Sequence, residues 1–190
     1  FYILGENDIK YYDVKTPSTT FFYNNAMKNG GQLQTTYTQN IGKNFNFALE
    51  YMGLRSQGLY KNNLAASNNT LFSGHYRSKN NKYEAYAHYI HQNVNNQENG
   101  GIADLDVFLS GDSRFNNRQN IDTNLSGVES RYSYRRYYFS QEFSPLDPAK
   151  YPFKIRHTLT HQGNKYYFSE TTTDPSYFNS TDITGFPLYN

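Results

Sequence analysis

The chain has 190 residues, a formal net charge of +2, no cysteine, no tryptophan and a mean hydropathy of −0.87. The small net charge gives no reason to expect nucleic-acid binding, and the lack of cysteine excludes disulfides and thiolate chemistry. Most of the apolar volume comes from 20 Tyr and 14 Phe, whereas a soluble core of this size is normally built from Leu, Ile and Val.

The chain begins with an irregular lead-in over residues 1–16, which ends at Thr16-Pro17. After it, short segments alternate apolar with polar residues, most clearly over residues 45–51. Strict alternation places successive side chains on opposite faces of a strand. The pattern predicts strands at 18–23, 32–39, 45–55, 69–78, 83–92, 130–143 and 153–162, with one more short strand at 165–170.

The predicted connections alternate between short and long along the chain. The short ones are 40–44, 79–82 and 144–152, and the long ones are 24–31, 56–68, 93–129 and the tail from residue 163. In an up-and-down sheet, alternate connections lie at opposite ends, so all long loops fall at one end, as in outer-membrane barrels. The predicted fold is therefore all-β: an antiparallel up-and-down transmembrane β-barrel with about seven strands, in which residues 1–190 form part of one domain and 93–129 form a long extracellular loop. The alternative is a soluble all-β domain.

The alternation also assigns the two faces of the predicted wall, because Arg or Lys facing lipid at the bilayer midplane costs roughly 2–4 kcal/mol. We expect a lipid-facing set consisting of Phe47, Leu49, Phe72, Tyr76, Ala85, Ala87, Ile155 and Leu159. We expect a lumen-facing set consisting of Asn46, Glu50, Arg77, Glu84, Arg135, Lys154, Arg156 and Thr158. Inward Arg and Glu either pair and brace the wall or bias the charge of the solute. Arg135 and Arg136 are adjacent, so one of them must face lipid unless it snorkels or lies near a strand end.

Other candidate sites are weaker. His88 and His91 lie three apart on a strand and therefore on opposite faces, so they cannot chelate a metal together. Asp104, Asp106 and Asp112 lie with Asp122 in the long loop and are weak candidates for Ca²⁺, but their spacing matches no calcium loop and a solvated surface loop is the default. Gly100-Gly101 predicts a sharp turn with positive φ rather than an anion site. No enzyme signature is present, and no cofactor is expected.

Several stretches resemble the β-barrel porin family of Bacteroidota outer membranes. The matching stretches are Asp8-Ile9-Lys10-Tyr11-Tyr12-Asp13-Val14 with Thr16-Pro17, Phe22-Tyr23, Phe45-Asn46-Phe47, Tyr51-Met52-Gly53-Leu54-Arg55-Ser56, Lys82-Tyr83, Gln97-Glu98-Asn99-Gly100-Gly101-Ile102, Arg136-Tyr137-Tyr138 and Phe178. The resemblance covers most of the chain and implies the first part of a larger barrel in the outer membrane of a Gram-negative bacterium.

The leading hypothesis for function is a passive or mildly selective pore for small solutes, with membrane lipid as partner and no nucleic acid. One alternative is a barrel scaffold that joins other outer-membrane proteins, with its lumen plugged by the long loop. Another is a soluble, Tyr-rich carbohydrate-binding domain, which the lack of Trp weakens.

Residues 1–4 do not resemble a secretory signal. An odd number of strands leaves two unpaired edges, so we expect more chain to complete the barrel, unless residues 1–12 or 165–170 supply an eighth strand. A native mass near 22.1 kDa would contradict the expectation of a longer chain.

Overall fold

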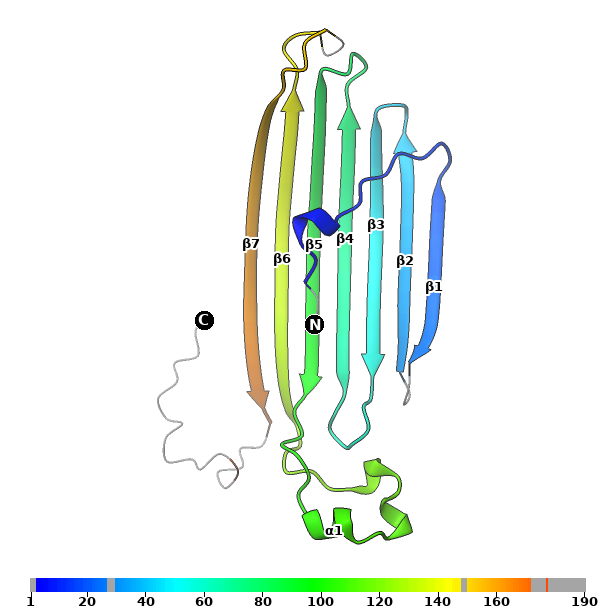
Figure 1. Cartoon of the computed structure of the whole chain (residues 1–190), viewed down its shortest axis with the longest axis vertical. Coiled ribbons are helices and arrows are strands. Elements are labelled where there is room, and N and C mark those ends of the chain that lie inside the picture. The colour runs from blue at the N-terminus through cyan, green and yellow to red at the C-terminus, as the bar shows by residue number, and fades with distance from the viewer. Residues whose placement is uncertain (1–2, 27–29, 148–149, 172–176, 178–190) are drawn as a thin grey trace, which may run out of the picture.

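The computed structural model describes residues 3–26, 30–147, 150–171 and 177. Most of these residues form a single sheet of seven antiparallel strands, in which each strand pairs with its neighbours along the chain (Figure 1). The strands are β1 (Ser18–Ala26), β2 (Gly30–Ile41), β3 (Phe45–Ser56), β4 (Ala65–Arg77), β5 (Tyr83–Gln97), β6 (Val128–Phe143) and β7 (Ile155–Glu170). The predicted all-β, up-and-down architecture is confirmed.

Several strands extend further toward the long loops than the sequence pattern predicts. β4 begins at Ala65 and β5 runs to Gln97, although the many Asn residues near these ends disfavour strands. These residues stay in the sheet because the neighbouring strand offers each a partner, as Asn96 does for Ala65. Residues 165–170 likewise continue β7, so the separate short strand predicted there is wrong.

The connections do not alternate strictly between short and long. Residues 24–26 and 30–31 belong to β1 and β2, so the predicted long loop over 24–31 is wrong at these positions, and residues 27–29 lie outside the described part. The connection 144–154 is also longer than the connection 57–64 at the opposite end. The strand order was thus predicted correctly, but the argument from loop length holds mainly for the longest connection, 98–127.

Helical structure in the described residues is confined to short segments. The long loop holds α1 (Leu105–Leu109), η2 (Ser113–Phe115) and η3 (Arg118–Asn120), and the lead-in holds η1 (Glu6–Asp8). In the described part of the chain, no helix is long and apolar enough to cross a membrane.

The described part of the lead-in, residues 3–16, crosses one face of the sheet in front of β5, β4, β3 and β2 (Figure 1). We call this the inner face and the opposite one the outer face. Ile9 packs there against Leu71, Ile90 and Tyr134, and these four side chains form a small buried cluster. Because β4, β5 and β6 each contribute one of them, the lead-in is fixed at the middle of the sheet.

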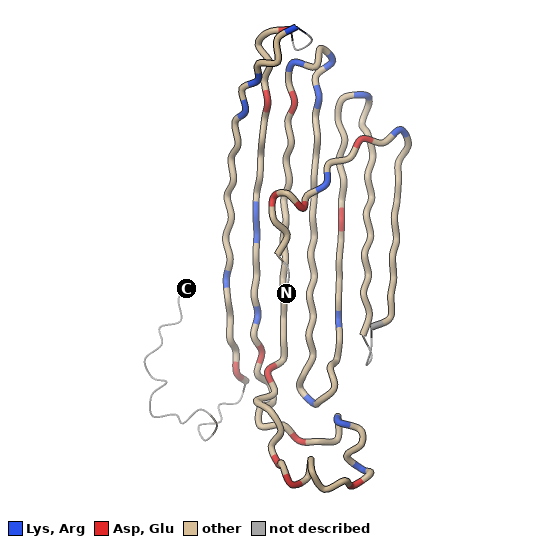
Figure 2. The backbone as a smooth tube through the Cα atoms, viewed as in Figure 1, with Lys and Arg blue, Asp and Glu red and all other residues tan. Residues whose placement is uncertain are grey.

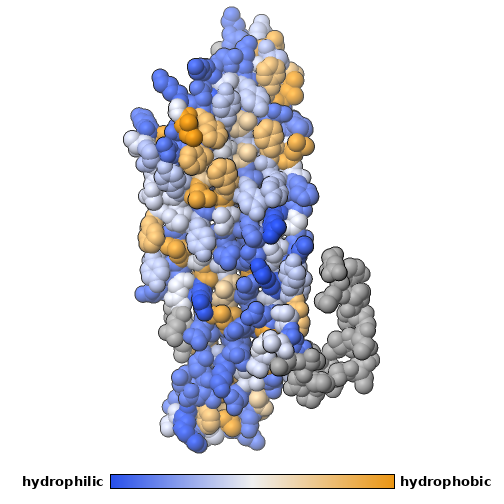
Figure 3. Space-filling view, turned by 180° about the vertical axis from the view of Figure 1, so that it is seen from behind, coloured by the Kyte–Doolittle hydropathy of each residue, from blue (hydrophilic) through white to orange (hydrophobic). Residues whose placement is uncertain are grey.

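The outer face carries exposed apolar and aromatic side chains, which gather toward the end with the short turns (Figure 3). Those exposed on the strands include Ile41, Leu49, Phe72, Tyr76, Phe139, Phe143, Ile155 and Leu159. Closer to the long loops, the same face becomes polar. An apolar surface of this extent requires a nonpolar environment or a partner.

The sheet is open in the described residues. β1 and β7 are its edges, and each pairs on one side only. An edge strand exposes backbone N–H and C=O groups, which are costly to leave unpaired in hydrocarbon.

Candidate functional site on the inner face

The register places six of the eight predicted lumen-facing residues on the inner face. Glu50, Leu71, Ile90 and Arg136 are aligned across β3, β4, β5 and β6, and Leu71 and Ile90 pack beneath the lead-in, which identifies the inner face. By alternation along each strand, the same face carries Asn46, Arg77, Glu84 and Arg156, together with Thr158. The predicted lipid-facing set lies entirely on the outer face.

The other two predicted lumen-facing residues, Lys154 and Arg135, do not lie on the inner face of a strand. Lys154 precedes β7, and its Nζ donates to Glu142 Oε2 at 3.2 Å. Arg135 lies on the outer face, so the prediction that it shares the face of Glu50 is wrong. The cause is its neighbour Arg136, which is only 3% exposed and occupies the inner face. Adjacent strand residues point to opposite faces, so only one of the two arginines can lie inside.

Arg136 is satisfied by inner-face partners rather than by a carboxylate. Its Nε donates to His88 Nε2 at 3.1 Å, one terminal nitrogen donates to the Tyr134 hydroxyl at 3.3 Å, and the other donates to the Gly5 carbonyl at 2.9 Å. Because a buried donor without a partner is costly, these contacts fix the guanidinium and hold the start of the lead-in against β6.

His88 connects Arg136 to the lead-in. Its ring stacks on Tyr138 with centroids 4.6 Å apart, and its Nδ1 lies 2.8 Å from the Tyr11 hydroxyl. Since Nε2 accepts a hydrogen bond from Arg136, a neutral imidazole carries its proton on Nδ1 and donates it to the Tyr11 oxygen. The sequence pattern did not identify Arg136 or His88 as site residues. His88 lies two residues from Ile90 on the same strand and therefore on the same face, and this spacing could have indicated that His88 faces inward.

Tyr12 anchors the next part of the lead-in to β3. Its hydroxyl donates to Glu50 Oε1 at 3.2 Å. Burial, followed by the neighbouring Glu50 carboxylate, raises the pKa of Tyr12 to about 12. Burial is also the main cause of the raised pKa of Tyr11. Both phenols are therefore neutral at physiological pH and act as hydrogen-bonding groups.

Hydrogen bonds continue along the lead-in on both sides of these tyrosines. Ser73 Oγ donates to the Lys10 carbonyl at 3.2 Å, and Thr160 Oγ1 donates to Glu6 at 3.1 Å. Asn40 of β2 accepts from the Val14 N–H at 3.2 Å and donates to Asp13 at 2.8 Å. The lead-in is thus bonded to strands from β2 to β7.

Ion pairs lie at the end of the inner face nearer the short turns, where Figure 2 shows basic and acidic positions close together. Arg77 pairs with Glu84, its direct partner across β4 and β5. Glu142 pairs with Arg156, its direct partner across β6 and β7, and also with Lys154. These charges are therefore matched between neighbouring strands.

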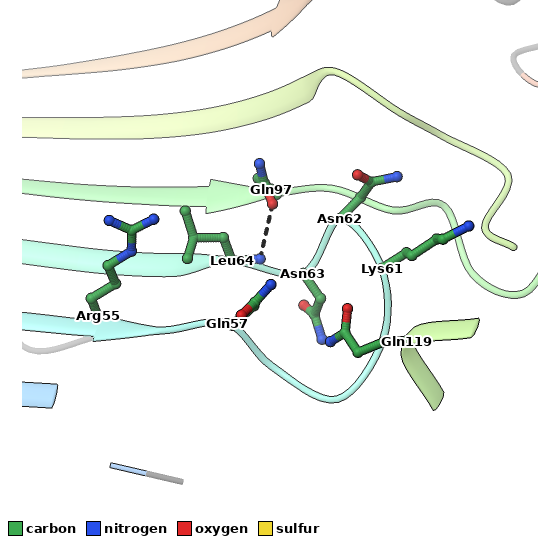
Figure 4. Close-up of a pocket in the computed structure, with 8 residues that line it drawn as sticks. All are labelled: Arg55, Gln57, Lys61, Asn62, Asn63, Leu64, Gln97 and Gln119. Carbon is green, nitrogen blue, oxygen red and sulfur yellow. Dashed lines mark hydrogen bonds between the residues drawn. The ribbon is translucent and has the colours of Figure 1, made fainter. Parts of the chain in front are cut away.

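At the opposite end, a polar pocket of about 540 Å³ opens between the β3–β4 connection, the end of β5 and the long loop (Figure 4). Its lining consists of Arg55, Gln57, Lys61, Asn62, Asn63, Leu64, Gln97 and Gln119. Gln97 Oε1 accepts from the Leu64 N–H at 3.2 Å. Lys61 is paired with Asp122 at 2.6 Å. Side-chain amides dominate this lining, which suits hydrogen bonding to uncharged polar solutes and provides no nucleophile with an adjacent base.

The loop carboxylates mainly serve the local fold. Asp104 caps α1 by accepting from the N–H groups of Asp106 and Val107. Asp112 caps η2 and forms an ion pair with Arg114, whose hydrogen bonds lower the pKa of that carboxyl. The described residues contain no group of three or more side chains suited to hold a metal ion.

Gly100 and Gly101 have φ angles of +66° and +85°. The predicted sharp turn with positive φ is therefore confirmed. Asn124 holds this turn by donating to the Gly100 carbonyl at 2.8 Å.

A family model described as "Putative porin" matches residues 1–187. The chain belongs to this porin family. No curated protein and no solved structure matches the chain. Membership in the porin family, together with the all-β fold, places the protein in the outer membrane of a Gram-negative bacterium.

Proposed function

We propose that this porin-family chain forms part of the wall of a passive, mildly selective pore for small polar solutes. In this proposal the inner face lines the lumen, and the apolar half of the outer face contacts lipid. A barrel wall needs this arrangement, because lipid accepts apolar side chains and an aqueous lumen accepts charged ones.

The observation that carries the proposal is the distribution of charge. On the half of the sheet nearer the short turns, every Asp, Glu, Lys and Arg within the strands lies on the inner face. Arg77, Glu84, Glu142 and Arg156 lie there on the inner face, whereas Ile155 and Leu159 lie on the outer face of the same strands. A soluble sandwich places its charged residues on the exposed face, so this pattern favours a membrane wall.

We further propose that the ion pairs at the short-turn end brace the wall. Glu84 and Glu142 are matched by basic partners on the adjacent strands, so the net field that this end presents to a solute is small. Selectivity then depends mainly on size, and the lead-in sets that size because it occupies the inner face. The long loop projects beyond the end of the sheet (Figure 1), and this position supports a pore rather than a barrel plugged by that loop.

Closure requires partners for β1 and β7. Unpaired backbone groups cost several kcal/mol each in hydrocarbon, so we expect further strands to pair with both edges. The described lead-in contains no strand, and residues 165–170 are part of β7, so neither segment supplies the eighth strand of a small closed barrel.

The test is to reconstitute the complete polypeptide that carries this chain into planar bilayers and into liposomes. We expect stepwise ion conductance, and uptake of neutral sugars that declines with sugar size. Heat-modifiable migration on gels would establish that the barrel is folded. A folded barrel that neither conducts ions nor admits small sugars would contradict the proposal.

A further inference from the structure

The outer face of the strands carries very few charges, and all of them lie toward the long loops. By register these are Arg55, Glu129, Arg131, Arg135 and Lys165. Each lies on the half of its strand that is nearer the long loops, and four of the five are basic. This end of the outer face is therefore cationic, whereas the other end is apolar.

Three of these cations form a strip across β6 and β7. Lys165 lies opposite Ser133, and Arg131 and Arg135 flank Ser133 two residues away on either side. Diagonal neighbours of this kind lie about 7–8 Å apart, and their Cβ atoms are somewhat closer. All three side chains are exposed, and in the described part of the chain none of them forms an ion pair. We call these three residues the cationic strip.

The strip begins where the apolar surface ends. Arg135 lies two residues beyond Tyr137, which faces outward opposite His161. With a rise of about 3.4 Å per residue, the strip extends from about 7 to about 20 Å beyond Tyr137 along the strand. Strand tilt shortens this distance along the membrane normal, which places the strip at the depth of lipid headgroups.

An apolar hollow of about 460 Å³ lies on the outer face near the Arg135 end of the strip, because Tyr137, two residues from Arg135, contributes to its lining. Phe72, Ala87, Tyr89, Tyr137, Leu159 and His161 contribute to its lining. Ala87 and its partner Gly74 carry almost no side chain, so the surface is recessed there between larger residues. A hollow of this shape and polarity suits an acyl chain, and the adjacent cations suit its headgroup.

We propose that the cationic strip and this hollow bind a phosphorylated lipid of the outer leaflet, namely lipopolysaccharide, through its lipid A phosphates and one acyl chain. Guanidinium groups bind phosphate through two parallel hydrogen bonds, and the Lys165 ammonium adds a third cation between them. The acyl hollow favours a lipid over free phosphate. The inference rests on the proposed function and on the orientation expected from the sequence, in which the long loop lies outside the cell.

The test compares three probes on the complete folded protein in detergent: diphosphorylated lipid A, dephosphorylated lipid A and inorganic phosphate. The test variant carries Arg131→Gln, Arg135→Gln and Lys165→Gln. The matched control carries Lys43→Gln, Lys79→Gln and Lys150→Gln, which removes three exposed charges from the short-turn end. If the test variant does not fold, Lys165→Gln alone replaces it.

We expect the test variant to lose roughly 100-fold in affinity for diphosphorylated lipid A, about fivefold per cation, and the control to lose less than about threefold. Dephosphorylated lipid A should bind wild-type protein as weakly as the test variant binds the phosphorylated form. Equal losses in test and control, equal binding of both lipids, or full competition by inorganic phosphate would each overturn the inference. Conductance of the same samples separates the two proposals, because a non-conducting protein that still selects phosphorylated lipid would contradict only the pore.

Discussion

The inner and outer faces of this sheet are built from the same strands, but their charged side chains differ in burial and in hydrogen-bonding partners. On the inner face, Arg136 is almost fully buried and is held by His88, Tyr134 and the lead-in. On the outer face, Arg135 is exposed and has no ion-pair partner among the described residues. Two adjacent arginines therefore have unrelated surroundings. The comparison teaches that a charged residue in this wall must be understood by its face and its depth, and not by its position in the sequence.

The largest expected effect comes from placing a charge on the apolar half of the outer face. Leu159→Arg should destabilise the folded barrel by about 2–4 kcal/mol, because the guanidinium would face hydrocarbon. Thr158→Arg, one residue away on the inner face, should change stability by less than about 1 kcal/mol. Urea titration of folding into phosphocholine vesicles measures both. Equal costs for the two variants would contradict the assignment of the faces.

The adjacent arginines give the next largest effect. Arg136→Ala should cost about 1–3 kcal/mol, since it leaves the Gly5 carbonyl and His88 without a donor in a buried site. Arg135→Ala should leave stability within about 0.5 kcal/mol. Hydrogen exchange of the lead-in amides provides a second readout and should accelerate only in Arg136→Ala. Faster exchange in Arg135→Ala would show that the two faces are not independent.

The lead-in should respond to loss of its two phenolic hydroxyls. The double variant Tyr11→Phe with Tyr12→Phe removes two inner-face hydrogen bonds, each contributing about 1 kcal/mol. We expect single-channel recordings to show more frequent transitions to a larger conductance, as the lead-in leaves the wall. Unchanged conductance would mean that the lead-in does not limit the pore.

Alkaline pH should have a related effect through Tyr12. Its pKa is raised from 10.0 to about 12, so docking favours the neutral phenol. The stabilising contribution is complete below pH 10 and is lost as the pH rises toward about 12. Conductance should therefore be constant up to pH 10 and increase above it, and Tyr12→Phe should reduce this increase. An increase in conductance that begins below pH 9 would mean that a group other than Tyr12 controls it.

The smallest effect concerns the ion pairs at the short-turn end. A double-mutant cycle with Arg77→Gln and Glu84→Gln should give a coupling energy below about 1 kcal/mol, because the Arg77 side chain is 49% exposed. Ion selectivity should also change little when both charges are removed together. A strong shift in selectivity in the double variant would favour a role in choosing solutes over bracing.

Strand order and face assignment could be predicted from the sequence because both follow from local alternation. The run from Phe45 to Tyr51 fixes which side chains share a face, whatever the rest of the chain does. Strand ends could not be predicted in this way. The Asn-rich residues near Gln97 look like a loop in isolation, and they form a strand only because β4 and β6 lie alongside.

The inner-face site was harder to predict, because it depends on contacts across long stretches of sequence. Glu50 was identified from its polarity, but its partner Tyr12 comes from the lead-in, which has no periodicity. The prediction placed Arg135 inside and was wrong, because alternation within β6 does not show which of its two faces packs beneath the lead-in. The capping roles of Asp104 and Asp112 depend on short helical turns that carry no strong sequence signal.

The central claim is that the outer face of the sheet contacts lipid and the inner face contacts water. The most direct test measures the surroundings of successive side chains along one strand. Residues 1–190 contain no cysteine, so single cysteines at positions 46 to 50 of β3 are the only labelling sites within this part of the protein, and any cysteine elsewhere in the complete protein is replaced by serine. In vesicles containing the complete protein, collision rates with dissolved oxygen report exposure to lipid, and those with a water-soluble nickel chelate report exposure to water. The two faces predict that labels at 47 and 49 favour oxygen and labels at 46, 48 and 50 favour nickel, apart from reduced access beneath the lead-in. Nickel access at 47 and 49 equal to that at the even positions would contradict a lipid-facing outer surface.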